Sequence, residues 1–351
     1  MRQAANSLLI TGASAGLGRA LALLYAGQGR TLALMGRNTA RLQDVADECR
    51  ARGAIVEAHA CDLCEASTGH DFIRAFAAAN PIDLLIVNAG IFAGHHPECE
   101  MEDAGEVTAI LRTNLEAAIL TIAAALPAMR ARRGGRIAII GSLAALHPLA
   151  DAPAYSASKA GLMAYGEALR EWLLPDGVGV SLVYPGHIET AHVAGHVGAL
   201  PLIVSAEVAA GRIKRGLDRG HDHIAFPRRL LWLIRAGRLV PWRLRAALGR
   251  SLRFETLPGL LMTAHVTEWN LQALHSRALE EATVEHDREQ AKSPRKDTRT
   301  TFEEFTSGAS WRELPMKIKL MVLHLWRAER DVAPPSRSDA ARSDGARSDK
   351  D

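Results

Sequence analysis

Short apolar runs alternate with longer stretches of helical spacing from residue 7 to about residue 227, and this rhythm constrains the fold more than any other feature. Strands that alternate with helical patterns predict βαβ units and a parallel sheet. The runs are apolar throughout, which is typical of strands covered on both faces. We therefore expect an α/β fold, a doubly wound parallel sheet of about seven strands with helices on both faces. The predicted strands contain Leu8–Ile10, Leu32–Met35, Ala54–Val56, Leu84–Val87, Ile137–Ile140, Val180–Val183 and Ile224–Phe226.

Length and composition are those of a soluble globular protein with an appendage. Of the 351 residues, 48% are hydrophobic and 23% are charged, which excludes a collagen-like or wholly disordered chain. No run reaches the roughly 18 consecutive apolar residues that cross a bilayer. The apolar run near the N-terminus is too short for a secretion signal, so we expect a cytoplasmic location.

The four cysteines do not predict a disulfide scaffold, which agrees with a reducing compartment. Cys61 and Cys64 form a C-x-x-C pair, but the sequence offers no second ligand pair at zinc-site spacing. We expect two thiols beside a strand end and no metal site.

A glycine-rich turn follows the first predicted strand and opens a helix, with the sequence Thr11-Gly12-Ala13-Ser14-Ala15-Gly16-Leu17-Gly18. Glycines allow a tight turn and a close approach of the backbone to a pyrophosphate, which backbone N–H groups and the helix N-terminus then hold. Such turns also occur for structural reasons alone, so the motif needs support from the rest of the chain.

Tyr155 and Lys159 are spaced i and i+4, so both side chains project from one face of a predicted helix. A free phenol titrates near pH 10, too high for ready proton exchange at neutral pH. A neighbouring ammonium group favours the phenolate and lowers its pKa. Ser142, at the end of the fifth strand, is placed to hydrogen-bond a substrate oxygen. These three residues predict general acid–base chemistry.

In order and spacing, the motifs of residues 11–190 resemble those of the short-chain dehydrogenase/reductase family, which implies a Rossmann-type fold and hydride transfer between a nicotinamide cofactor and a ketone or secondary alcohol. The resemblance implies a catalytic set of Asn114, Ser142, Tyr155 and Lys159, in which Asn114 lies in a long helix and holds a water that relays protons to Lys159. It also implies a cofactor site of Thr11, Gly12, Ser14, Gly16, Leu17, Gly18, Arg37, Asp62, Leu63, Asn88, Ala89, Gly90, Tyr155, Lys159, Pro185, Gly186, Ile188 and Thr190.

The end of the second strand indicates which dinucleotide binds. An NAD site usually has an acid there for the ribose 2′-hydroxyl, whereas an arginine accommodates a 2′-phosphate. Here the acid is missing and Gly36 and Arg37 stand in its place. We predict NADP(H), with NAD(H) as the alternative, in which case Arg37 stacks on the adenine.

Residues 228–253 contain eight arginines and no acid, interleaved with leucine and tryptophan. Interfacial helices have this composition, so peripheral attachment to the inner face of a membrane is one interpretation. The other is that the apolar side packs on the enzyme body or a second subunit. Nucleic acid is disfavoured, because no recognised binding motif accompanies the charge. The predicted organisation is a catalytic domain 1–227, a helical extension 228–280, a disordered linker 281–309, a short helix 310–330 and a disordered tail 331–351.

Two functions are compatible with the sequence. The first is an oxidoreductase in which Tyr155 acts as general acid and base on a small carbonyl or alcohol, with residues 191–219 covering the substrate. The resemblance implies a homodimer or homotetramer. The second is a catalytically silent dinucleotide-binding regulator or scaffold; the presence of both Tyr155 and Lys159 favours the enzyme. Within the enzyme class, the alternative is a peripheral-membrane reductase of lipid-like ketones. The substrate itself is not specified by the sequence.

Overall fold

The computed structural model describes residues 5–95, 101–189, 196–197, 202–237, 239–241, 243 and 255–256 of the 351. The described elements, in chain order, are β1 (Ser7–Thr11), α1 (Gly16–Tyr25), β2 (Thr31–Gly36), α2 (Thr39–Ala51), β3 (Ile55–Ala60), α3 (Ala66–Ala79), β4 (Leu84–Val87), α4 (Ala104–Leu111), the π-helical turn η1 (Arg112–Glu116), α5 (Ala117–Arg132), β5 (Arg136–Ile140), the 3₁₀ turn η2 (Leu143–Ala145), α6 (Pro153–Trp172), the 3₁₀ turn η3 (Leu174–Asp176), β6 (Gly179–Pro185), β7 (Ile188–Glu189), β8 (His196–Val197), β9 (Val204–Ser205), α7 (Ala206–Asp218), β10 (His223–Phe226), α8 (Arg228–Gly237) and β11 (Glu255–Thr256).

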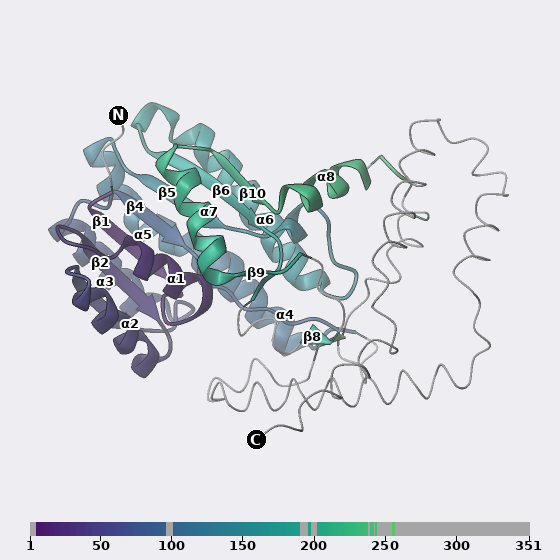
Figure 1. Ribbon diagram of the computed structural model, residues 1–351, viewed down its shortest axis with the longest axis horizontal. Coiled ribbons are helices and arrows are strands. Elements are labelled where there is room, and N and C mark those ends of the chain that lie inside the picture. Colours follow the sequence, from purple (N-terminus) through teal and green to yellow (C-terminus); the bar gives the residue numbers. More distant parts are fainter. Residues whose placement is uncertain are drawn as a thin grey trace, which may run out of the picture. The chain divides into compact units, whose positions relative to one another are not determined.

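Seven strands form one parallel sheet in the order β10-β6-β5-β4-β1-β2-β3 (Figure 1). The order reverses between β1 and β4, which is the switch point of a doubly wound sheet. All seven predicted strands are present, and the expected fold class is confirmed. Two short pairs, β7 with β9 and β8 with β11, were not predicted, because two-residue strands leave no periodic signal.

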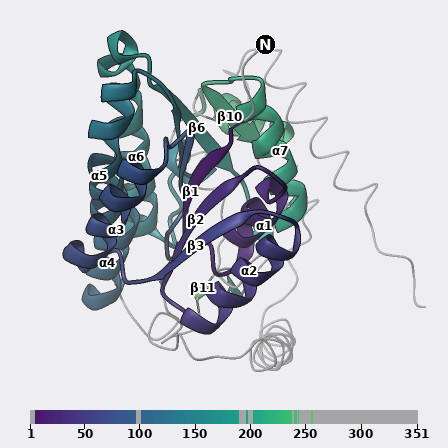
Figure 2. The ribbon, with the colours of Figure 1, turned by 90° about the vertical axis from the view of Figure 1, so that its left-hand side faces the viewer.

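Helices cover both faces of the sheet, as Figure 2 shows with α1, α2 and α7 on one side and α3, α5 and α6 on the other. Successive strand residues point to opposite faces. In β1, Leu8 and Ile10 join one hydrophobic core, whereas Leu9 joins the other. This explains why the central strands are apolar throughout. The edge strand β3 differs, because Ile55 is exposed while its neighbour Val56 is buried.

The span 104–132, which comprises α4, η1 and α5, is long and apolar enough to cross a membrane by length and composition, with a mean hydropathy of 1.5 over its most apolar window. It is the one such span among the residues that the structure describes. Half of that window is buried within the fold. Ile122 and Leu126 on α5 belong to a core that α5 shares with the sheet, so the packing of this helix accounts for its apolar character.

Helix α8 packs on the sheet through one side only. Leu230, Leu231 and Ile234 join the same core as α5 and α6. This agrees, for that side of α8, with the interpretation in which the Arg-rich segment packs on the enzyme body. The predicted linker 281–309, the helix 310–330 and the tail 331–351 lie outside the described residues, as does Thr190.

Candidate active site

The glycine turn between β1 and α1 is folded tightly against the end of β4. Gly12 and Gly16 have φ values of 66° and 51°, a region in which residues with a Cβ are strained. A Cβ on Gly18 would lie 2.0 Å from the carbonyl oxygen of Gly12, and one on Gly12 would lie 2.9 Å from Cα of Ala89. The predicted glycines are therefore required by the turn itself.

Asn88 at the end of β4 fixes this turn. Its Nδ2 donates hydrogen bonds to the carbonyl oxygens of Thr11 at 3.0 Å and of Gly12 at 3.2 Å. In return, the Thr11 hydroxyl oxygen accepts from the backbone N–H groups of Asn88 and Ala89. Thr11, Gly12, Asn88 and Ala89 are thus one hydrogen-bonded unit, as expected for residues at the carboxyl ends of adjacent strands.

The N-termini of α1 and α3 have no side-chain cap at the N-cap residue, unlike those of α2, α4 and α7. Side chains of Asn38, Asp103 and Ser205 cap those three helices by accepting from backbone N–H groups of the first turn. No side chain described in the structure caps α1. Its first-turn N–H groups therefore lack a protein acceptor of this kind, and a helix N-terminus of this length favours an anion. This end of α1 fits a phosphate group.

Arg37 follows β2 beside the glycine turn. A Cβ on Gly36 would lie 3.0 Å from Oγ of Ser14, which places the end of β2 against the turn. The Arg37 side chain is exposed, and no ion pair or hydrogen bond within the described part of the chain engages its guanidinium. After β3, Oδ1 of Asp62 accepts from the backbone N–H of Cys64 at 2.9 Å.

Tyr155 and Lys159 lie in the first two turns of α6, and Ser142 lies just beyond β5. Ser142 and Tyr155 share a side-chain hydrogen bond. Lys159 is buried, its Nζ donates to the carbonyl oxygen of Ile140 at 3.2 Å, and the same Nζ lies 5.9 Å from the centroid of the Tyr155 ring. The structure brings these three predicted residues together from β5 and α6.

Burial dominates the electrostatics of the pair on α6. It raises the pKa of Tyr155, and the hydrogen bond with Ser142 opposes that rise. It lowers the pKa of Lys159 from 10.5 to about 8, because the charged ammonium loses solvation. Lysine is almost never this deeply buried without a partner carboxylate. A lysine that titrates near the working pH of the cell is unusual outside functional sites.

Asn114 lies in η1 rather than in a regular α-helical turn. Its Oδ1 accepts from the Ile91 N–H at 2.7 Å, and its Nδ2 donates to the Ile91 carbonyl oxygen at 2.9 Å, as a neighbouring strand would. Nδ2 also lies 3.2 Å from Oγ of Ser158. A Cβ on Gly90 would lie 3.1 Å from Oδ1 of Asn114 and 3.3 Å from Nζ of Lys159, so the three residues converge. Both the oxygen and the nitrogen of the Asn114 amide contact protein groups, and its role in holding a water stays a prediction.

The segment after β6 forms the other side of the site. The Gly186 N–H donates to the carbonyl oxygen of Phe226 at 2.8 Å. A Cβ on Gly186 would lie 2.9 Å from Cδ of Pro227 and 3.5 Å from Cδ1 of Leu143, the residue after Ser142. Ile188 pairs with Val204 in the β7–β9 pair. Burial lowers the pKa of the half-buried His187 beside it.

Two residues at the site were not predicted. The ring of Phe92 packs edge-on against the Tyr155 ring, with centroids 4.8 Å apart. Both carboxylate oxygens of Glu102 accept from the Ala154 N–H, at 3.0 and 3.2 Å, in the first turn of α6. An acid stabilises a helix N-terminus, but Glu102 reaches α6 from a distant loop, so no local sequence pattern reveals it.

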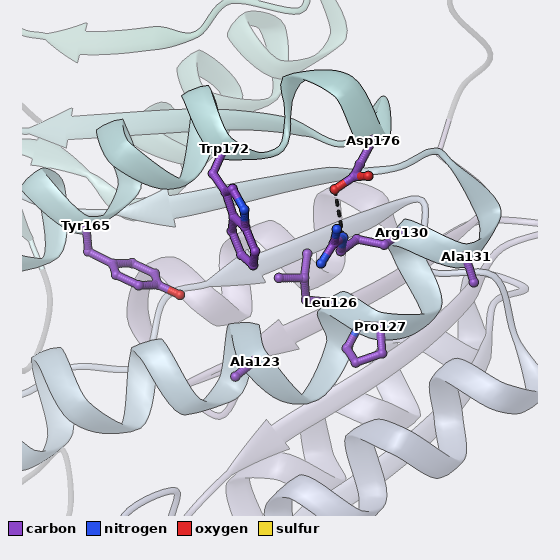
Figure 3. A pocket seen from close by; sticks show the side chains of 8 residues that line it. All are labelled: Ala123, Leu126, Pro127, Arg130, Ala131, Tyr165, Trp172 and Asp176. Atoms are coloured by element: carbon purple, nitrogen blue, oxygen red, sulfur yellow. Dashed lines mark ion pairs between the residues drawn. The ribbon is translucent and has the colours of Figure 1, made fainter.

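A separate pocket of about 610 Å³ lies between α5 and α6 (Figure 3). Arg130 and Asp176 form an ion pair at 2.7 Å in its wall, and the guanidinium of Arg130 lies 5.0 Å from the ring centroid of Trp172. These residues stand at the ends of helices that lead into β5 and β6. The pocket is therefore at the amino ends of the strands, opposite the edge that carries Ser142 and Gly186.

Comparison with known proteins gives consistent matches over the sheet. The sequence pattern of the short chain dehydrogenase family matches residues 6–197. An oxidoreductase of Myxococcus xanthus strain DK1622 is 36% identical over 249 residues, 71% of this chain and 98% of that one. The 3-dehydrosphinganine reductase TSC10B of Arabidopsis thaliana is 34% identical over 52% of this chain and 55% of its own.

Among solved structures, a short-chain dehydrogenase from Sphingobium yanoikuyae in complex with NADPH has a TM-score of 0.56 at 26% identity, covering 63% of this chain and 87% of that one. The seven-stranded sheet and its glycine turn define a Rossmann-type oxidoreductase. The chain belongs to the short-chain dehydrogenase family.

Proposed function

We propose that this protein is an NADP(H)-dependent oxidoreductase that interconverts a ketone and a secondary alcohol, with Tyr155 as general acid and base. One observation carries the proposal: the Ser142–Tyr155 hydroxyl pair stands beside a buried lysine of lowered pKa, at the sheet edge that also holds the glycine turn. When bound, NADPH supplies the hydride that reduces the carbonyl carbon.

The residues of this chain fit a dinucleotide. The turn formed by Thr11, Gly12, Ser14, Gly16, Leu17 and Gly18 would hold the pyrophosphate against the uncapped N-terminus of α1. Asp62 and Leu63 would contact the adenine, and Lys159 would anchor the ribose. The nicotinamide end would be bordered by Asn88, Ala89, Gly90, Tyr155, Pro185, Gly186, Ile188 and Thr190.

The proton transfer is assigned to the hydroxyl pair. In the reducing direction Tyr155 donates its proton to the carbonyl oxygen while the Ser142 hydroxyl donates a hydrogen bond to the same oxygen. The charge on Lys159 favours the phenolate that remains. Asn114 holds the Ile91 backbone in place, and a water bound beside Asn114 would relay protons to Lys159.

Preference for NADP(H) rests on the end of β2. Arg37 is exposed beside Ser14 and Gly36, and its guanidinium suits a 2′-phosphate. The solved neighbour from Sphingobium yanoikuyae is in complex with NADPH. The alternative, a silent regulator or scaffold, has no supporting observation: a scaffold gains nothing from a buried lysine that is costly to keep protonated.

We expect a cytoplasmic enzyme acting on a small-molecule carbonyl or alcohol as a homodimer or homotetramer. The test is NADPH oxidation against a panel of short, cyclic and long-chain ketones, with the alcohol identified in each product mixture. We expect kcat/KM for NADPH to exceed that for NADH by at least about tenfold, and Arg37→Ser to remove that preference. A tenfold preference for NADH would overturn the cofactor assignment, and failure to bind either nucleotide would overturn the function.

A further inference from the structure

Helix α8 exposes large apolar side chains on its outward side. Trp232 is 64% exposed and Leu233 is 48% exposed, and Leu239 just beyond the helix is 82% exposed. The opposite side of α8 already packs on the core through Leu230 and Ile234. Trp232 and Leu233 are therefore not needed to attach α8 to the fold, and their exposure calls for another explanation.

The same outward side is cationic. Arg228, Arg229 and Arg235 are exposed on α8, and no ion pair of the described residues engages them. No aspartate or glutamate occurs between residues 228 and 253. The guanidinium of Arg235 lies 5.9 Å from the ring centroid of Trp232, so charge and apolar surface are interleaved rather than separated.

Helix α8 begins beside the candidate active site. Cδ2 of Leu230 lies 3.5 Å from the Cβ position of Gly186, where Cδ1 of Leu143 is equally close. The exposed residues Leu202 and Ile203 precede β9, whose Val204 N–H donates to the carbonyl oxygen of His187. The start of α8 thus lies at the carboxyl end of the sheet, beside the candidate active site.

We propose that the outward face of α8, formed by Arg228, Arg229, Trp232, Leu233 and Arg235, docks on an anionic lipid surface and presents the entrance of the active site to it. Indole and leucine side chains enter the headgroup boundary, while arginines contact anionic headgroups. The consequence for substrate, which rests on the proposed function, is that the enzyme reduces a lipid-like ketone held in a membrane.

Charge decides between a lipid surface and a second copy of the chain. A twofold contact through this face would set the three arginines of one copy against the same three of the other. No acid on α8 or in the following residues up to 253 would offset that repulsion. An anionic bilayer provides negatively charged headgroups for the arginines and an apolar interior for Trp232 and Leu233.

The test is co-sedimentation of the full chain, without nucleotide, with phosphatidylcholine vesicles that do or do not contain about 30 mol% phosphatidylglycerol. We expect the protein to bind the anionic vesicles at least tenfold more strongly than the phosphatidylcholine vesicles. This binding should weaken as the salt concentration rises from about 0.05 to 0.5 M. The double variant Trp232→Ser/Leu233→Ser and the triple variant Arg228→Gln/Arg229→Gln/Arg235→Gln should each lose at least tenfold. Trp172→Ser, which removes an indole of similar exposure from the end of α6, should bind as wild type does.

Wild-type protein that stays in the supernatant would overturn the proposal. It would also be overturned if the double variant bound vesicles as strongly as wild type does. If that variant were in addition smaller by light scattering, Trp232 and Leu233 would form a subunit contact instead. Vesicle binding is read without catalysis, so its failure leaves the proposed function standing if the same sample oxidises NADPH. For the substrate class, the double variant should lose at least tenfold in kcat/KM on a vesicle-embedded long-chain ketone but less than twofold on a water-soluble one; equal losses would overturn that part.

Discussion

In most proteins charged side chains are exposed and large apolar side chains are buried. Helices α6 and α8 depart from this rule in opposite ways. Helix α6 buries a lysine at 5% exposure, whereas α8 leaves a tryptophan 64% exposed. Apolar residues on a protein surface are common, but a buried charge or an exposed large apolar patch is informative. Both departures occur at the carboxyl edge of the sheet, where doubly wound folds bind their ligands.

On each helix, contacts within the fold explain the burial or exposure of some residues but not of others. On α6, Ser156 and Ser158 are buried but bond to carbonyl oxygens of Ala152 and Tyr155, so they are structural. Lys159 also donates one hydrogen bond to a carbonyl oxygen, that of Ile140, but burial lowers its pKa. On α8, Ile234 packs in the core, whereas Trp232 is mostly exposed to solvent. Ser156, Ser158 and Ile234 thus have structural roles, whereas we propose a catalytic role for Lys159 and a docking role for Trp232.

The largest expected effect is on α6. Tyr155→Phe removes the proton donor and should lower kcat by about 10²- to 10⁴-fold, while the NADPH dissociation constant changes little. Steady-state kinetics and a fluorescence titration measure the two quantities. Tyr165→Phe is the matched control, because Tyr165 lies on the same helix but lines the pocket at the other end of the sheet. Equal activity in the two variants would contradict the role of Tyr155.

The next effect sharpens the contrast within α8. Ile234→Ala deletes buried methyl groups and should lower the free energy of unfolding by about 2–4 kcal/mol. Trp232→Ser changes only exposed surface and should stay within about 0.5 kcal/mol of wild type. Chemical denaturation of both variants in the absence of lipid makes the measurement. A large loss for Trp232→Ser would mean that its indole packs on protein and would weaken the lipid-docking proposal.

A smaller effect concerns the cost of the buried lysine. Burial lowers the pKa of Lys159 from 10.5 to about 8. At pH 7 the lysine is protonated in both states, but the folded state binds this proton less tightly than the unfolded state does. At 1.36 kcal/mol per pKa unit this penalty is on the order of 3 kcal/mol. It is present below pH 8 and is relieved as the pH rises from about 8 toward 10.5, so the wild-type free energy of unfolding should rise across that window.

Lys159→Met should abolish this rise and be about 1–2 kcal/mol more stable at pH 7, after the loss of the bond to Ile140 is subtracted. The same variant should be nearly inactive. Lys214→Met is the control, because that lysine pairs with Asp218 at the surface and should leave the alkaline rise intact. A less stable Lys159→Met protein would contradict the assigned electrostatics.

The sequence was sufficient for the sheet because each central strand is a run of apolar residues and the glycine turn is local. It also indicated Ser142, Tyr155 and Lys159, which the structure brings together. It did not reveal that Asn114 pairs with the Ile91 backbone or that Glu102 holds the start of α6, since both contacts join segments far apart in the chain. Nor did it show that α8 divides its apolar residues between the core and the surface, because that depends on which side meets the sheet.

Hydride transfer itself can be followed with NADPH that carries deuterium at both C4 positions of the nicotinamide. We predict that wild-type protein places one deuterium on the carbinol carbon of each alcohol formed from a ketone substrate, and that Tyr155→Phe binds the same NADPH but forms almost no labelled alcohol. Alcohol formed without deuterium, or labelled alcohol formed equally fast by Tyr155→Phe, would contradict the account.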